Sequence, residues 1–361
     1  MSIEIGISKF KNDNGISCYM NSILHILQQV PYFSDYIVLE SYLDDLKNKD
    51  VELSNFIVYE LYRIMKLSYE NDNINITPHT FKKLLAKKNP MWGELVQQDS
   101  QEFLIFIITK LEEELGNKID FVPGRKDFLT EKKDFLTIEN EKILPSDIYK
   151  ICGLDKNKKD FSIIRELFIG SITTKFICEY CNSHAPLFEN FITLSLDIPL
   201  HKDKEVYTLN DCMEHTFQDE KLDKHNKLNC DFCGIKNKST KQIKLWKTPK
   251  ILIIHFKRFK MNNYGQQVAK ITNEILYPSK KLNLSEYHHE NSPYKDNCIY
   301  DLFGINIHKE LLHNSVDVGH YVSVVKNRYN NKWYLFNDAC EPKQIKHKQN
   351  KNAYMLFYIK K

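Results

Sequence analysis

Two cysteine pairs of equal spacing constrain this chain more than any other feature, because they tie together segments that are far apart in the sequence. The first pair is Cys178 and Cys181, and the second is Cys230 and Cys233. A gap of two residues lets both thiolates of a pair reach one metal ion from a tight turn, and two such pairs complete a tetrahedral four-sulfur site. We therefore expect two hairpin tips that meet around one zinc ion. Such a site has no open coordination position, so the zinc would be structural.

The chain is expected to stay in a reducing compartment. It holds no apolar run long enough to span a membrane, and its N-terminus lacks the continuous apolar region of a secretory signal. We expect the cytosol or nucleus, where its nine cysteines are metal ligands, nucleophiles or packing residues before they are disulfides. The alternative of two coincidental pairs weighs less, because all four ligands occur in a reducing setting. The single cysteines expected to be packing residues are Cys152, Cys212, Cys298 and Cys340.

The bulk composition is that of a globular protein without a strong charge bias. Apolar residues make up 42% and charged residues 27% of the 361 residues, which is enough to bury a core and argues against wholesale disorder. The 51 basic and 47 acidic residues nearly balance, so we expect neither nucleic acid nor an anionic membrane as a partner. We expect one monomeric domain.

Hydrophobic periodicity separates a helical first third from a β-rich remainder. Apolar residues recur at helical spacing after Cys18, and again over 53–65 and 103–115. Residues 116–160 are rich in Lys, Asp and Glu, which predicts a solvated insertion. Runs rich in β-branched and aromatic residues then predict strands at 251–259, 299–308, 320–326, 332–337 and 353–359. This order predicts an α+β fold.

Cys18 is a candidate nucleophile because of the residues around it. In "NDNGISCYMNSILHILQQV" (12–30), Gly15 allows a tight turn and the helical spacing begins just after the cysteine. A helix N-terminus at Cys18 would stabilise a thiolate and lower the pKa of the thiol. The alternative is inert packing, which is the usual state of a lone cysteine.

A cysteine nucleophile also needs a base, and the base needs a group that orients it. Among thirteen histidines, only His320 sits in "GHYVSVVKNRYNNKWYLFNDA", where a glycine precedes it and a strand follows. A second strand ends at Asn337 and Asp338. Two adjacent antiparallel strands would bring one of these side chains to the His320 ring, so the residues predict a Cys–His–Asn/Asp triad.

These segments resemble the sequence boxes of the ubiquitin-specific protease family. Residues 12–33 are similar to its cysteine box, "QQDSQEFLIFIITKLEEEL" (97–115) to its glutamine–aspartate box, and residues 319–339 to its histidine box. "TPKILIIHFKRF" and the closing "AYMLFYIKK" follow in family order, so the resemblance covers the whole chain. We expect the cations of "FKRF" to snorkel at a strand end and assign them no chemistry.

The resemblance implies a papain-like cysteine protease that removes ubiquitin. Its single domain would comprise a helical thumb over 1–115, the charged insertion over 116–160, zinc-tipped β fingers over 161–250 and a β-rich palm over 251–361.

The resemblance also implies the role of each triad residue. Cys18 would be the nucleophile and His320 the general base. Asn337 falls where the family places the residue that orients the histidine, and Asp338 is the acidic neighbour that often follows it. Either side chain can accept the ring N–H.

The family boxes further suggest how the tail of ubiquitin is held. The tail ends in two glycines and needs a narrow channel, which Gly319 and Tyr321 would line beside the base. Gln98, Asp99 and Glu102 would belong to the same channel, where the two acids would meet arginines of the tail. The alternative is that these residues only cap a helix N-terminus.

Two other functions compete with an active deubiquitinating protease. One is a catalytically weak, ubiquitin-binding scaffold with the same fold, and the other is a zinc-dependent interaction module that does not bind ubiquitin. Intact Cys18 and His320 favour activity.

One departure from the family's sequence pattern favours the catalytically weak scaffold. The family usually has an asparagine five residues before the nucleophile, where its amide donates to the oxyanion. Here that residue is Asp13, flanked by Asn12 and Asn14. An ionised carboxylate would repel the developing negative charge. Asp13 could be protonated, a shifted loop could present Asn12 or Asn14, or backbone N–H groups at the helix start could form the oxyanion hole. We favour the backbone hole, with Asp13 turned toward solvent.

We therefore expect Asp13→Asn to raise turnover, because it would restore a donor where the charge develops. One oxyanion donor is worth about 10²–10³ in rate, which sets the upper limit of the gain. Asn14→Ala should change turnover little. Steady-state hydrolysis of a ubiquitin conjugate checks both variants. Loss of activity in Asp13→Asn, or a large loss in Asn14→Ala, would contradict the backbone hole.

Overall fold

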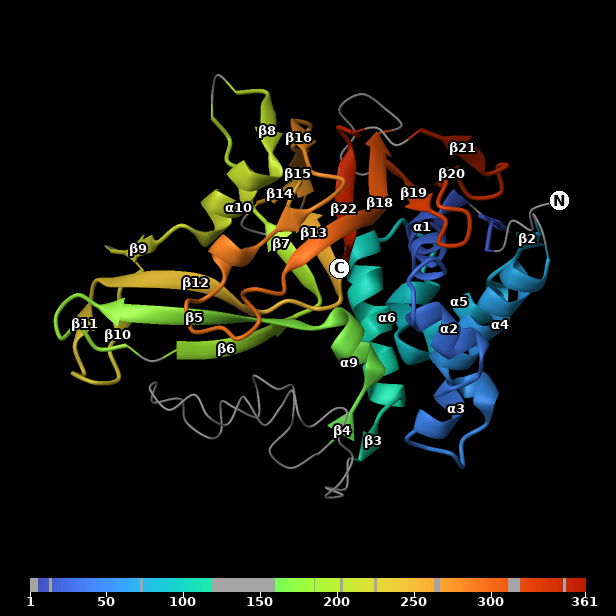
Figure 1. The fold of residues 1–361 in the computed structure, drawn as a ribbon, viewed down its shortest axis with the longest axis horizontal. Helices are drawn as coiled ribbons and strands as arrows, with labels where there is room; N and C mark the ends of the chain where they lie inside the picture. The colour runs from blue at the N-terminus through green and yellow to red at the C-terminus, as the bar shows by residue number, and fades with distance from the viewer. Residues whose placement is uncertain are drawn as a thin grey trace.

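The computed structural model describes residues 6–12, 15–71, 74–118, 160–184, 186–201, 204–223, 226–262, 267–310, 319–346 and 349–361. A group of helices packs beside an eight-stranded sheet, and a four-stranded sheet extends away from both (Figure 1). The charged insertion expected over 116–160 lies almost wholly outside the described residues.

Helices dominate the first third of the chain, as periodicity predicted. The longer helices are α1 (Cys18–Leu27), α2 (Phe33–Val38), α3 (Tyr42–Asp45), α4 (Ile57–Glu70), α5 (His79–Lys88), α6 (Ser100–Glu114), α9 (Ile163–Phe168) and α10 (Leu209–Phe217). Short 3-10 turns lie at Leu53–Asn55, Pro90–Gly93 and Ser285–Tyr287. Among the described residues, no helix has both the length and the apolar character that crossing a membrane requires.

The eight-stranded sheet contains every strand that composition predicted. Its order is β21 (Lys343–Ile345), β20 (Trp333–Phe336), β19 (Gly319–Lys326), β18 (Ile299–Glu310), β22 (Ala353–Lys360), β13 (Ile251–Phe256) and β7 (Thr193–Leu196), with β17 (Leu282–Asn283) paired to β18. The sheet is antiparallel except where β13 meets β7. Together with the helices it confirms the predicted α+β class.

The four-stranded sheet is long and narrow. Its order is β6 (Pro186–Phe191), β5 (Gly170–Cys178), β12 (Ser239–Lys247) and β9 (Glu220–Leu222). Two-stranded pairings are β1 (Lys9–Phe10) with β2 (Asn75–Ile76), β3 (Asn117–Lys118) with β4 (Asp160–Phe161), β8 (Val206–Thr208) with β16 (Glu274–Leu276), β10 (Leu228–Asn229) with β11 (Lys236–Asn237), and β14 (Phe259–Met261) with β15 (Gln267–Lys270).

Strand β13 explains why both faces of the eight-stranded sheet are buried. Ile251 and Ile253 pack with the helices, whereas Leu252, Ile254 and Phe256 pack into a second core on the opposite face that includes α10. Successive side chains of a strand alternate between faces, so a continuous apolar run is the pattern of a strand covered on both sides.

A buried asparagine joins the helices to this sheet. Asn306 on β18 is fully buried, donates to the Ser22 hydroxyl of α1 at 2.9 Å and accepts from the Ser100 hydroxyl of α6 at 2.9 Å. Because a buried amide must be paired, this contact fixes α1 and the start of α6 on the sheet.

The expectation for "FKRF" is wrong for Arg258. Its side chain is 1% exposed and donates to four backbone carbonyls, those of Ile271, Asn273, Lys351 and Ala353, at 2.7–2.9 Å. The planar guanidinium can satisfy several acceptors at once, which is why a cation can be buried here.

We expect Arg258→Lys to lower the free energy of unfolding by about 3 kcal/mol, because an ammonium cannot reach all four carbonyls and leaves buried acceptors unpaired. Lys257→Gln is the matched control, since Lys257 is exposed and pairs with Asp197 at the surface. That change should cost less than about 1 kcal/mol. Chemical denaturation of both variants checks the difference, and equal losses would contradict it.

Candidate active site

Cys18 is the first residue of α1, as its sequence context predicted. Gly15 has a φ of +73°, which favours glycine, and its N–H donates to the Asn12 carbonyl at 3.2 Å. The Asn12 side chain then accepts from the Ser17 N–H at 2.7 Å. This turn presents the cysteine at the helix start. The thiol is nevertheless only 2% exposed.

The base and its orienting residue come from neighbouring strands. His320 lies on β19 and Asn337 follows β20, which pairs antiparallel with β19. The distance from His320 Nε2 to Asn337 Oδ1 is 2.6 Å, whereas Asp338 Oδ2 lies 3.8 Å from the same nitrogen. Only Asn337 is within hydrogen-bonding distance. Because the amide oxygen accepts, Nε2 carries the proton and Nδ1 keeps a lone pair.

Asp338 has a different position in the site. Its carboxylate accepts from the Asn12 amide at 2.8 Å and from the Asn21 amide at 2.8 Å, and its carbonyl accepts from the Phe10 N–H at 3.1 Å. Its φ of 46° lies in the left-handed region that aspartate tolerates. Asp338 lies in the turn after β20, and its hydrogen bonds therefore join this turn to the segment before Cys18 and to helix α1.

The pKa of the Cys18 thiol is raised, whereas the sequence context predicted a lowered pKa. The pKa of this thiol is raised to about 11, mainly by burial and also by the nearby Asp338 carboxylate. Backbone hydrogen bonds at Tyr321, Tyr19 and Cys18 itself lower the pKa but do not offset burial. Since Tyr321 directly follows His320, the first of these bonds places the sulfur beside β19, the strand that carries His320. The raised pKa favours the neutral thiol over the thiolate.

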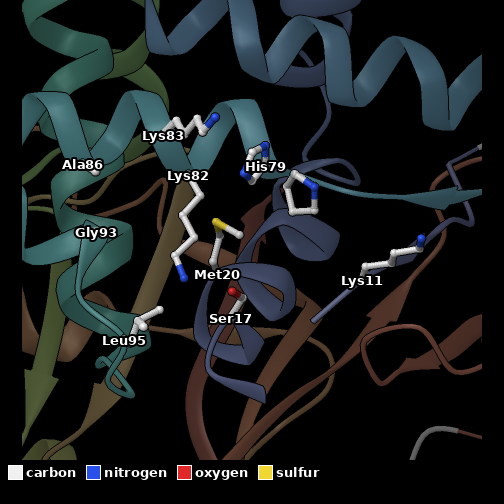
Figure 2. A pocket seen from close by; sticks show the side chains of 10 residues that line it. Lys11, Ser17, Met20, His79, Lys82, Lys83, Ala86, Gly93 and Leu95 are labelled. Atoms are coloured by element: carbon white, nitrogen blue, oxygen red, sulfur yellow. The ribbon is translucent and has the colours of Figure 1, made fainter. Parts of the chain in front are cut away.

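A hollow of about 260 Å³ lies beside the start of α1 (Figure 2). Ser17 and Met20 form its floor, and α5 forms one wall. The cationic lining residues are Lys11, Lys82 and Lys83, with His79 next to them, and none of the described lining residues is acidic. Lys82 extends from α5 toward α1 (Figure 2). The surface next to the nucleophile's helix thus attracts anionic groups more than cationic ones.

Asp99 behaves as a structural cap. Its Oδ1 accepts from the Gln101 and Glu102 N–H groups at the start of α6, and its Oδ2 accepts from the hydroxyls of Tyr321 at 3.1 Å and Tyr354 at 2.6 Å. These four bonds support the capping alternative for Asp99 and bury Tyr321 against it. The Glu102 side chain stays exposed.

Gly319 and Gln98 complete the residues expected to hold the tail. A Cβ on Gly319 would lie 1.9 Å from the His308 ring, so only glycine fits at this point of the strand. Its N–H donates to the side chain of Gln97 at 3.2 Å. Gln98 instead donates to the Met91 carbonyl at 3.3 Å.

Sequence reasoning did not assign three residues that build the site: Gln97, Asn21 and Tyr354. Gln97 was quoted only as the first residue of the segment 97–115 and was given no role of its own. Asn21 could have been noticed as an asparagine inside an apolar helix, since it is buried at 1% exposure. Asp13 and Asn14, the residues expected near the oxyanion, lie outside the described residues. Asn12 is described, and both ends of its amide are engaged.

The four paired cysteines meet in space. Cys178 ends β5, and Cys230 and Cys233 lie in the turn between β10 and β11. The four sulfurs all lie within 4.8 Å of one another. A tetrahedral ion with Zn–S bonds of about 2.3 Å needs sulfurs about 3.8 Å apart, so the donor set fits one metal ion with small adjustments.

Both turns have the same backbone form. The N–H of Asn182 donates to the Cys178 carbonyl and the N–H of Gly234 donates to the Cys230 carbonyl. Asn182 and Gly234 have φ values of 56° and 71°. The left-handed residue after each pair reverses the chain, which turns both thiols of a pair toward the other pair.

The single cysteines differ from one another. Cys212 and Cys298 are buried, as expected, but Cys340 is exposed, which corrects its assignment as a packing residue. Cys340 lies in the tight turn after β20, where its N–H donates to the Asn337 carbonyl and no core covers it. Cys152 lies outside the described residues.

Comparison with known proteins places this geometry in one family. The family model described as ubiquitin carboxyl-terminal hydrolase matches residues 10–358. Human ubiquitin carboxyl-terminal hydrolase 2 is 27% identical over 95% of this chain. A probable ubiquitin carboxyl-terminal hydrolase of Acanthamoeba polyphaga mimivirus is 29% identical over 87% of the chain and 72% of its own length. The chain spans 54% of the human relative.

Solved structures support the fold. The Ubp8/Sgf11/Sus1/Sgf73 deubiquitinating module bound to ubiquitin aldehyde matches the whole chain and 71% of its own chain, with a TM-score of 0.72 and 24% identity. A second structure of the yeast SAGA module matches with a TM-score of 0.71 and 25% identity. The chain therefore has the papain-like fold of ubiquitin-specific proteases, and its cysteine cluster lies where zinc-tipped fingers were expected.

Proposed function

The chain belongs to the ubiquitin carboxyl-terminal hydrolase family, and from this membership we propose that it is a thiol protease that hydrolyses the bond after the C-terminal glycine of ubiquitin. The observation that carries the proposal is the arrangement of Cys18, His320 and Asn337. The sulfur lies beside the strand of the base, and the base is held in one tautomer by an amide at 2.6 Å.

The proposed reaction begins with a neutral thiol. His320 Nδ1 takes the proton of Cys18 Sγ as the sulfur attacks the carbonyl carbon of the terminal glycine, and Nε2–H continues to donate to Asn337. The imidazolium then gives its proton to the amine of the leaving lysine, and a thioester forms. Water, activated by the same ring, hydrolyses the thioester and releases the ubiquitin carboxylate and the free thiol.

We propose that backbone N–H groups at the start of α1 hold the oxyanion. The backbone hydrogen bonds of Cys18 and Tyr19 to the sulfur mean that these N–H groups face the reacting atom. Ser17 gives the helix no side-chain cap, and both ends of the Asn12 amide are engaged elsewhere. Free N–H groups at a helix start are suited to a developing negative charge.

We propose a divided role for the channel residues. Gly319 and Tyr321 lie beside the base and would line the narrow passage for the two glycines of the tail. Glu102 is exposed and would meet an arginine of the tail, whereas Asp99 would keep Tyr321 and Tyr354 in place through its hydrogen bonds. Gln98 would support the same segment from the Met91 side.

We propose that Cys178, Cys181, Cys230 and Cys233 hold a structural zinc ion. All four donors are thiolates, which leaves no open position for chemistry, and the cluster belongs to strands that do not contribute to the triad. The ion would fix the two turns at the tip of the four-stranded sheet, so its contribution would be to folding.

The thumb, fingers and palm proposed over 1–115, 161–250 and 251–361 follow the helix group and the two sheets. Two elements inside 161–250 pack outside the four-stranded sheet. Helix α9 packs with the helices, and strand β7 pairs with β13 of the eight-stranded sheet. We propose that the domain acts as a monomer in the cytosol or nucleus, where Cys18 and the clustered thiols stay reduced.

Cys18→Ala tests the function directly. Hydrolysis of a ubiquitin C-terminal conjugate should fall by at least about 10³-fold, because the variant has no nucleophile. Ubiquitin binding should persist, since a wide surface supplies affinity. Cys340→Ala is the matched control and should keep the wild-type rate, because its thiol is exposed and bears no role in the triad. Wild-type turnover in Cys18→Ala would refute a thiol protease. Binding without turnover in the unmodified protein would support the scaffold alternative.

Substitutions of Asn337 and Asp338 should have different effects: the first should lower the rate and the second should lower the stability. We expect Asn337→Ala to lower kcat by about 10²-fold with little change in KM or Tm, because only the orientation of the base is lost. Asp338→Asn should lower the free energy of unfolding by about 2 kcal/mol, because Asn12 and Asn21 donate to different carboxylate oxygens and the amide replaces one of these oxygens with a donor. The reverse pattern, with the larger kcat loss in an undestabilised Asp338→Asn, would assign the orienting role to Asp338.

Zinc should be present at one equivalent in protein purified without chelator. We expect Cys181→Ser to lose the ion and to lower Tm, while kcat of the folded fraction stays close to the wild-type value. The reason is that the metal stabilises only the tip of the four-stranded sheet. Cys340→Ser, a change of the same chemistry outside the cluster, should keep both zinc and Tm. Elemental analysis and thermal melts check these outcomes. Metal-free wild-type protein, or equal Tm in the two variants, would contradict the site.

A further inference from the structure

A second hollow, of about 290 Å³, lies far along the chain from the triad residues, between the four-stranded sheet and the segment that follows the 3-10 turn at Ser285–Tyr287. Thr173 and Lys175 of β5, Gln242 and Lys244 of β12, and His288 and Lys295 of the covering segment line it. The segment is fixed on the sheet because the His289 N–H donates to the Leu245 carbonyl at 2.8 Å.

The register of β5 and β12 places their lining side chains on one face. Thr173 is opposite Lys244 and Lys175 is opposite Gln242, and residues two apart on a strand share a face. Lys241 is opposite Phe176 and therefore points to the other face, where it pairs with Glu220 at 3.3 Å. The two faces of this sheet are thus chemically distinct.

The hollow is positively charged. Lys175, Lys244 and Lys295 are all partly buried, and within the part of the chain that the structure describes none of them has an acidic partner at ion-pair distance. Glu290 is the acid among the lining residues. Three partly buried cations near one acid favour an anion between them.

His288 contributes an acceptor to the hollow. The Ser292 hydroxyl donates to the Trp246 carbonyl, so its oxygen can only accept at the 3.2 Å contact with His288 Nδ1. Nδ1 therefore carries the proton and Nε2 keeps a lone pair. His288 is 4% exposed, and its Nε2 has no partner in the structure. Burial, and then Lys360 and Lys295, lower the pKa of His288 to about 4, which keeps the ring neutral.

Thr173 contributes a donor. Its side chain is 2% exposed, and its hydroxyl has no hydrogen-bond partner. Buried polar groups are nearly always paired, so two such groups in one hollow indicate that something polar completes them. A ligand that fits must offer negative charge to the lysines, an acceptor to Thr173 and a proton to His288.

We propose that this hollow binds a phosphate group. The lysines would neutralise its charge, the Thr173 hydroxyl would donate to one oxygen, and His288 Nε2 would accept the proton that phosphate carries near neutral pH. Sulfate has charge and shape in common with phosphate but brings no proton. The site stands apart from the proposed hydrolase activity, and it uses none of the residues of the triad or the cysteine cluster.

Isothermal titration with inorganic phosphate at constant ionic strength tests the proposal on the intact chain. Wild-type protein should bind one equivalent saturably, and sulfate should bind more weakly. Lys244→Gln should weaken phosphate binding by about tenfold, as expected for one lost hydrogen bond to a charged group. Lys241→Gln removes the same charge from the other face of the same strand and should leave the affinity unchanged.

Thr173→Val keeps the shape of the side chain and removes only the hydroxyl. Because this hydroxyl has no partner, Tm should not fall, whereas phosphate binding should weaken. Equal affinity for sulfate and phosphate, equal losses in Lys244→Gln and Lys241→Gln, or unchanged binding in Thr173→Val would each overturn the proposal.

The same titration, run at about pH 5.5 so that a phosphate monoester also keeps one proton, identifies the source of the phosphate group. Free phosphate and a phosphoserine peptide that bind with equal affinity would assign the site to small phosphates. Tighter binding of the peptide, lost on dephosphorylation, would assign it to a phosphorylated protein. Both results support a phosphate site.

Discussion

The carboxylate of Asp338 holds the candidate active site together. It accepts one hydrogen bond from Asn12 and one from Asn21, and these three residues come from opposite ends of the chain. The loop before Cys18 and the turn after β20 are thereby fixed to each other. One further bond, from the Phe10 N–H to the Asp338 carbonyl at 3.1 Å, binds the same segment to this turn through the backbone. The position of sulfur relative to imidazole therefore depends on an interaction that takes no part in the chemistry.

The amide and the carboxylates of the site have different roles, and burial explains why. The half-buried amide of Asn337 can accept from the His320 ring without adding charge beside it, whereas the charge of Asp338 is spread over two amide donors. Asp99 follows the same rule with two backbone N–H groups and two tyrosine hydroxyls. Both of these carboxylates, Asp338 and Asp99, are thus paired for structure, which leaves His320 as the candidate group for moving a proton. The raised pKa of Cys18 fits this division, because the thiol depends on that base.

Most of the fold and the triad could be predicted from the sequence because their patterns are local. The run after Cys18 has helical spacing, the strands around His320 and Asn337 alternate as strands do, and the two cysteine pairs need only a tight turn each. The choice between Asn337 and Asp338 could not be predicted, because it depends on which side chain the distant Asn12 and Asn21 hold. The thiol pKa was mispredicted for a similar reason, since burial of Cys18 is set by packing of α1 against β19 and not by its neighbours in sequence. The same is true of Arg258, whose four carbonyl partners come from two separate segments.

The central claim is that the geometry selects one thiol, Cys18, for attack on the C-terminus of ubiquitin. The most direct measurement is to map the adduct that forms with a ubiquitin probe carrying a C-terminal electrophile. The account predicts a mass increase of one probe, attached to Cys18, even though this thiol is buried and Cys340 is exposed nearby. A probe attached to Cys340 or to a cysteine of the cluster, or no adduct in folded protein, would contradict it.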